Sequence, residues 1–68
     1  MKTTDIINFI KSKGYKEIAS KSRKYRTFKH DNSDLLVFIG KRGAVRKGKT
    51  SSQSISITEN IKKRIEGN

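Results

Sequence analysis

Apolar positions near the N-terminus recur with the spacing of an α-helix. Isoleucines lie about one turn apart, at Ile6, Ile7 and Ile10. Thr3 or Thr4 can cap the start of such a helix, and Gly14 suits a left-handed stop at its end. The pattern predicts a helix over residues 4–13.

The middle of the chain alternates short apolar segments with turn residues. Four segments have the composition of strands, over residues 15–19, 25–29, 35–39 and 44–47. A dense turn signal over residues 30–34 and glycines at positions 40, 43 and 48 separate the later ones. This spacing predicts an antiparallel meander of three or four strands, with the continuous apolar run 35–39 at its centre.

The C-terminal segment carries a second helical stripe. Isoleucines recur at every fourth position, at Ile57, Ile61 and Ile65. Ser56 and Glu59 have the spacing of a capping box, in which each side chain bonds the backbone of the other residue. Residues 54–57 also alternate polar and apolar side chains, so this segment can begin as a strand instead.

The order of helix, meander and helix predicts one domain over residues 1–68 in the α+β class, with an α-β-β-β-α arrangement. One sheet face then needs cover, and both helices are expected to pack on it. The other face is left to solvent or a ligand.

Composition narrows the class of protein further. Cysteine is absent and His30 is the only histidine, so we expect no disulfide framework, no metal site and no cofactor. The N-terminal residues are too polar for a signal peptide, and no apolar run is long enough to span a bilayer. We therefore expect a soluble cytoplasmic protein without a membrane partner.

Charge is the strongest functional signal in the chain. Seventeen Lys and Arg against six Asp and Glu give a formal net charge of +11 in 68 residues. Self-repulsion of this size disfavours the compact state and is relieved by an acidic partner. Nucleic acid is the favoured partner, and an acidic protein is the alternative.

The basic residues concentrate in two segments without acidic residues. Each segment holds five cations within nine residues: Lys21, Arg23, Lys24, Arg26 and Lys29 in the first, and Lys41, Arg42, Arg46, Lys47 and Lys49 in the second. These are the predicted phosphate contacts, and glycines in the second segment let backbone N–H groups approach an anion. Tyr25 and Phe28 are candidates for stacking on a base, although alternation puts one of them in the core.

Candidates for catalysis are few. His30 is the only side chain suited to proton transfer near neutral pH, and a single histidine beside a turn is more often a structural residue. Asp31 and Asp34 lie in the same turn, where aspartates usually bond their own backbone. The spacing around Gly48 does not match a nucleotide-binding phosphate loop. We predict no catalytic residue.

The first part of the chain resembles a known family of toxins. Gly14-Tyr15 after the helix, then Ser22-Arg23-Lys24-Tyr25 and Phe28-Lys29-His30, resembles the HicA-type toxins over about the first thirty residues. These are small basic proteins with an α-β-β-β-α fold related to double-stranded RNA-binding domains. In that family a Gly-Ser-His segment before the Phe supplies a histidine for mRNA cleavage, whereas this chain has Ser22-Arg23-Lys24. The resemblance implies the fold and RNA affinity, and it argues against ribonuclease activity.

Three hypotheses about function follow. The first is a non-catalytic module that grips the phosphate backbone of RNA or DNA. The second is a mobile-element inhibitor or regulator that docks on a host protein. The third is an mRNA-cleaving toxin of the HicA type, which would depend on His30.

Overall fold

The computed structural model describes residues 2–20 and 23–66, which form an α+β fold. The elements are, in chain order, α1 (Thr3–Ser12), β1 (Tyr15–Ile18), β2 (Tyr25–His30), β3 (Leu36–Gly40), β4 (Val45–Gly48), β5 (Ser54–Ser56), the 3-10 turn η1 (Thr58–Asn60) and α2 (Ile61–Glu66). The predicted fold class and the order of helix, meander and helix are confirmed.

Within these residues the sheet is an antiparallel meander of five strands in the order β1-β2-β3-β4-β5. This is one strand more than the upper number expected. The added strand, β5, is the segment whose alternation left open whether it starts a strand or a helix. Arg46 pairs with Ser56, and Gly48 pairs with Ser54.

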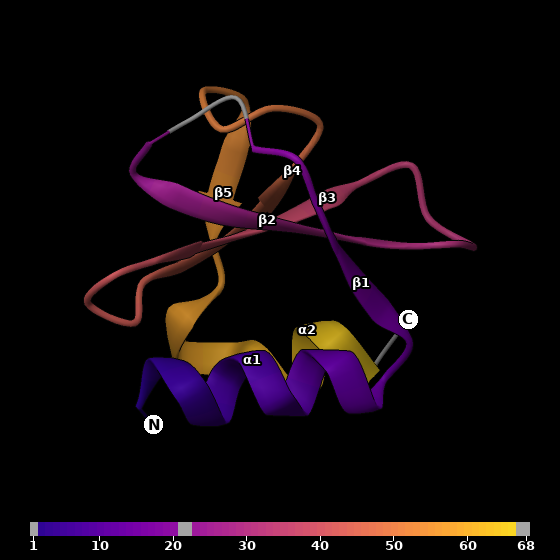
Figure 1. Cartoon of the computed structure of the whole chain (residues 1–68), viewed down its shortest axis with the longest axis vertical. Helices are drawn as coiled ribbons and strands as arrows, with labels where there is room; N and C mark the ends of the chain where they lie inside the picture. Colours follow the sequence, from indigo (N-terminus) through magenta and orange to yellow (C-terminus); the bar gives the residue numbers. More distant parts are fainter. Residues whose placement is uncertain (1, 21–22, 67–68) are drawn as a thin grey trace.

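Both helices pack on the same side of the sheet (Figure 1). Alternation along the strands turns Phe28, Val37, Ile39 and Val45 toward the helices, where they are buried. The helices contribute Ile6, Ile7, Ile10, Ile61 and Ile65, and Ile57 joins this core from the N-cap of η1. The two isoleucine stripes of the sequence therefore meet the central strands.

The predicted helix starts are wrong in detail. Lys2 is the N-cap of α1, and its ammonium has no acceptor for the backbone N–H groups; the hydroxyl of Thr3, one of the expected caps, donates to the carbonyl of Lys41 at 3.2 Å. The capping box at Ser56 does not form, because Ser56 lies in β5. Thr58 beside it accepts a hydrogen bond from the N–H of Val45 at 3.0 Å.

The sheet face away from the helices carries a second, smaller apolar group. Phe38 is only 5% exposed on this face, and its ring meets Tyr25 edge to face at 6.2 Å between centroids. Leu36 is half-buried on the same face, and Ile18 is 39% exposed. The loop between β4 and β5 lies at the end of the molecule away from the helices (Figure 1). We call the sheet face away from the helices the open face.

Candidate functional site

Parts of the two basic segments meet at one end of the sheet. Because Tyr25 pairs with Gly40, residues 23–24 before β2 and the turn after β3 lie together beside the start of α1. They enclose a recess of about 310 Å³, which we call the basic recess. Its lining residues are Thr3, Arg23, Lys24, Tyr25, Arg26, Ile39, Gly40 and Lys41. No acidic side chain belongs to this described lining.

The turn between β3 and β4 presents its cations through tight local geometry. The N–H of Gly43 donates to the carbonyl of Gly40 at 3.1 Å, and the N–H of Gly40 donates to the carbonyl of Ala44 at 2.8 Å. Gly43 has φ 87°, a conformation that glycine adopts without strain. Lys41 and Arg42 are thereby left exposed at the tip, and the hydrogen bond from Thr3 ties this tip to α1.

Arg26 is held by an acidic neighbour rather than left to face a ligand. Its Nε donates to Oε2 of Glu17 at 2.8 Å, and its Nη2 donates to Oε1 at 2.6 Å. These hydrogen bonds lower the pKa of the Glu17 carboxyl and raise the pKa of the guanidinium. Two of the donors of Arg26 are thus occupied, which weakens its assignment as a phosphate contact.

Arg46 also serves the fold. Its Nε donates to the Ser54 hydroxyl at 2.8 Å and its Nη2 to the Ser54 carbonyl at 2.6 Å, so the side chain joins β4 to β5. Lys47 lies on the helix-facing side, in a different recess with His30 and Ile65. The two sequence clusters therefore do not converge as complete sets on one edge.

The remaining predicted contacts are divided between the two ends of the sheet. Arg23, Lys24, Lys41 and Arg42 lie at the end with the basic recess. Lys29 and Lys49 lie at the opposite end, because Lys29 pairs with Leu36, and Lys49 follows Gly48, the partner of Leu36 on β4. Lys21 lies outside the described residues.

The stacking candidates have separate roles. Phe28 is 0% exposed in the core between sheet and helices, so its assignment as a stacking residue is wrong. The cause is alternation, since Phe28 shares its sheet face with Val37. Tyr25 lies on the opposite face, is half-buried and lines the basic recess, so it keeps part of its ring accessible.

One ring nitrogen of His30 is hydrogen-bonded to the backbone, and the other lies beside Gly14. Its Nδ1 accepts a hydrogen bond from the N–H of Asn32 at 3.0 Å, and its Nε2 lies so close to Gly14 that a Cβ there would be 2.9 Å away. Its ring meets Tyr15 edge to face at 5.2 Å between centroids. Burial raises the pKa of the Tyr15 hydroxyl. These contacts give the histidine a structural role beside the turn.

The open face holds a recess of about 290 Å³ that the search for charged motifs missed. Its lining residues are Ile18, Ala19, Thr27, Leu36, Phe38, Lys49, Thr50 and Ser51. We call it the open-face recess. The alternation of Leu36 and Phe38 against Val37 and Ile39 was the available signal, because it leaves two large apolar side chains on the face without helices.

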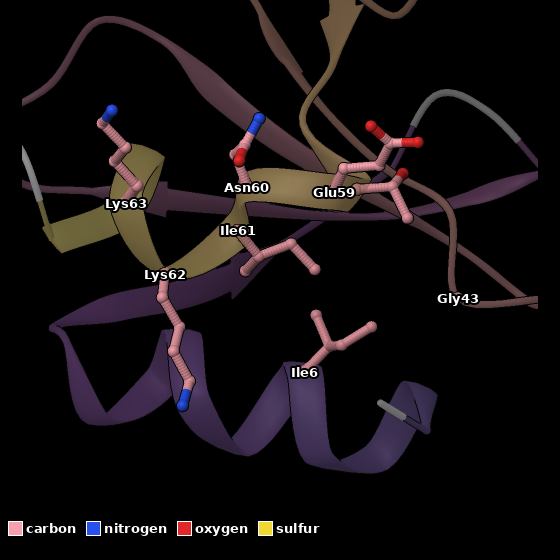
Figure 2. A pocket seen from close by; sticks show the side chains of 8 residues that line it. Ile6, Gly43, Glu59, Asn60, Ile61, Lys62 and Lys63 are labelled. Atoms are coloured by element: carbon pink, nitrogen blue, oxygen red, sulfur yellow. The ribbon is translucent and has the colours of Figure 1, made fainter.

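Another recess, of about 440 Å³, lies between α1, η1 and α2 (Figure 2). Ile6 and Ile61 form its apolar part, and its lining also includes Glu59, Lys62 and Lys63. The amine of Lys62 points toward α1, whereas that of Lys63 points away from it (Figure 2). This mixed-sign surface suits an anionic strand less well than the basic recess does.

No cluster of His, Cys, Asp and Glu suited to a metal ion occurs in the described part of the chain. Over residues 2–20 and 23–66, no helix is both long and apolar enough to cross a membrane. No protein family, curated protein or solved structure matches the chain significantly. The assignment of function therefore depends on the geometry of the site.

Proposed function

We propose that this protein is a non-catalytic module that binds the phosphate backbone of a nucleic acid through the basic recess and the adjacent turn. One observation carries the proposal: Arg23 from the first basic segment and Lys41 from the second line the same recess. The described lining of this recess contains no acidic residue. Arg42 at the exposed tip of the turn extends the same surface.

The proposal fits the physical chemistry of the chain. A net charge of +11 favours a strongly anionic partner, and phosphate contacts are made mainly by exposed Arg and Lys side chains. Docking on an acidic protein is the rival outcome that the experiment must separate.

The test is a salt-resolved binding titration with labelled oligonucleotides. The variant Arg23→Gln/Lys41→Gln/Arg42→Gln removes three exposed cations from the basic surface. If each engages one phosphate, the slope of log affinity against log salt falls by about 2 to 3, at 0.7 to 0.9 for each contact. Affinity should fall for all sequences alike, because phosphates carry no sequence information.

A matched control is available in the helical layer. The variant Lys11→Gln/Lys62→Gln/Lys63→Gln loses the same charge from exposed positions outside the basic recess. It should keep a slope closer to that of the unmodified protein. If both variants lose the same affinity and slope, binding depends on net charge alone and not on the basic recess. If the unmodified protein does not bind even at low salt, the proposal is rejected.

A further inference from the structure

The open-face recess combines an apolar floor with an accessible mouth. Leu36, Phe38 and Thr27 come from the central strands, and Ile18 forms one wall at the edge strand β1. Ile18 is 39% exposed, so part of its side chain is accessible at this wall. Across the recess stand Lys49, Thr50 and the half-buried Ser51, from the β4–β5 loop.

Cations lie beside one end of this apolar floor. Lys16 and Lys29 are directly paired on neighbouring strands of the open face, and Lys49 lines the recess itself. Asp31 reaches Lys16 at 3.9 Å, but both side chains are largely exposed, so water screens the pair. The surface therefore offers an apolar slot with positive charge at one end.

We propose that the open-face recess takes one unpaired base of a single-stranded nucleic acid, while Lys16, Lys29 and Lys49 hold the flanking phosphates. A volume near 290 Å³ lies just below the roughly 300 to 1,000 Å³ typical of ligand pockets, so the recess suits a small ligand such as a single base. This inference rests on the proposed function and adds to it the class of nucleic acid.

The charge pattern favours this occupant over the others. A duplex keeps its bases stacked and paired, so it can reach the lysines but not the apolar floor. A second copy of this chain would bring the same lysines against themselves, at a cost in like-charge repulsion. A base joined to two phosphates satisfies both the apolar floor and the cations beside it.

The test compares single-stranded and double-stranded RNA and DNA of equal length against two serine variants. Ile18→Ser removes the apolar wall of the recess, and Ile55→Ser is the matched control, since Ile55 is 58% exposed on the opposite edge strand, outside the recess. Ile18→Ser should weaken single-strand binding roughly fivefold to tenfold, in line with the lower range for removing one base contact. Its duplex binding and the binding of Ile55→Ser should stay unchanged.

A second measurement uses the unmodified protein, so it does not depend on how the variants fold. In the complex with a single strand, nuclear Overhauser contacts are expected between the Leu36 methyl groups and base protons. Absence of these contacts, or an equal effect of Ile18→Ser on single and double strands, overturns the inference. If the unmodified protein still binds oligonucleotides in a salt-dependent way, the proposed function stands without this inference. If it binds none, the proposed function and this inference are both wrong. Self-association that competes with oligonucleotide would identify a second copy as the occupant and also overturn it.

Discussion

Glu17 on β1 and Arg26 on β2 form a two-point ion pair, with Nε to Oε2 at 2.8 Å and Nη2 to Oε1 at 2.6 Å. Arg26 also belongs to the lining of the basic recess. The acid thus restrains a cation at the very surface that we propose for phosphates. Both side chains are partly exposed, so the pair contributes little to stability and its effect on binding is easier to measure.

Glu17→Gln should tighten nucleic-acid binding severalfold at low salt. The substitution removes the charged partner of Arg26, which leaves its guanidinium free to reach a phosphate, and it raises the net charge by one. The salt slope should become steeper by about 0.7 to 0.9, the value for one additional phosphate contact. Titration across a series of salt concentrations measures both quantities.

Glu59→Gln is the matched control for this prediction. It makes the same change in charge on η1, at the recess between the helices. If it increases affinity and slope as much as Glu17→Gln, the gain comes from net charge and the release of Arg26 contributes nothing.

The ion pair also predicts a small acid-dependent loss of stability. Hydrogen bonds from Arg26 lower the pKa of Glu17 in the folded protein from its ordinary value of 4.5. A group with a lowered folded pKa stabilises the protein above its unfolded pKa, and this contribution is lost as the pH falls through the folded value. The free energies of unfolding of the unmodified protein and of Glu17→Gln should therefore converge as the pH falls. A difference between them that grows below pH 4.5 would contradict the assignment.

The fold was predictable where local patterns and tertiary packing agree. The isoleucine periods and the glycine at position 14, which has φ 93°, predicted the first helix and its end. The fifth strand was left open because residues 54–57 alternate like a strand, whereas Ser56 and Glu59 have the spacing of a capping box. Its pairing depends on the close approach of Gly48 across the sheet, which no local pattern records.

The candidate site was less predictable than the fold, because charge clusters in sequence do not specify partners in space. Arg26 and Arg46 look equivalent to Lys41 in a count of cations, yet Glu17 and Ser54 hold them in the sheet. Strand alternation further sends Lys47 to the helix-facing side. The search for cation clusters missed the open-face recess because most of its lining is uncharged.

Arg46→Lys should separate the structural role of Arg46 from a role in binding. Lysine keeps the charge but lacks the planar fork that donates to both Ser54 oxygens, so the link between β4 and β5 weakens. We expect a loss of about 1 kcal/mol in the free energy of unfolding, the size of a typical net hydrogen bond. Affinity and salt slope should stay near those of the unmodified protein. Unchanged stability with a reduced salt slope would return Arg46 to the set of phosphate contacts.

Substitution by alanine should affect Gly48 and Gly40 differently, because an added Cβ meets close backbone atoms at Gly48 and only ordinary contacts at Gly40. A Cβ on Gly48 would lie 2.5 Å from Cα of Ser54 and 2.6 Å from the Gln53 carbonyl oxygen, so β4 and β5 must separate. We expect Gly48→Ala to lower the free energy of unfolding by about 1 to 3 kcal/mol, the usual cost of forcing extra atoms into a packed site. At Gly40 the nearest atom is 3.5 Å away, and alanine keeps the N–H bonded to Ala44, so near-normal stability is expected.

Denaturant unfolding of the two alanine variants measures this contrast. Backbone amide exchange at residues 54–56 should also rise in Gly48→Ala and not in Gly40→Ala, since only the first substitution disturbs the pairing of β5. Equal stability in both variants would mean that β5 relaxes away without cost. The Arg46 hydrogen bonds to Ser54 would then be too weak to fix the edge of the sheet.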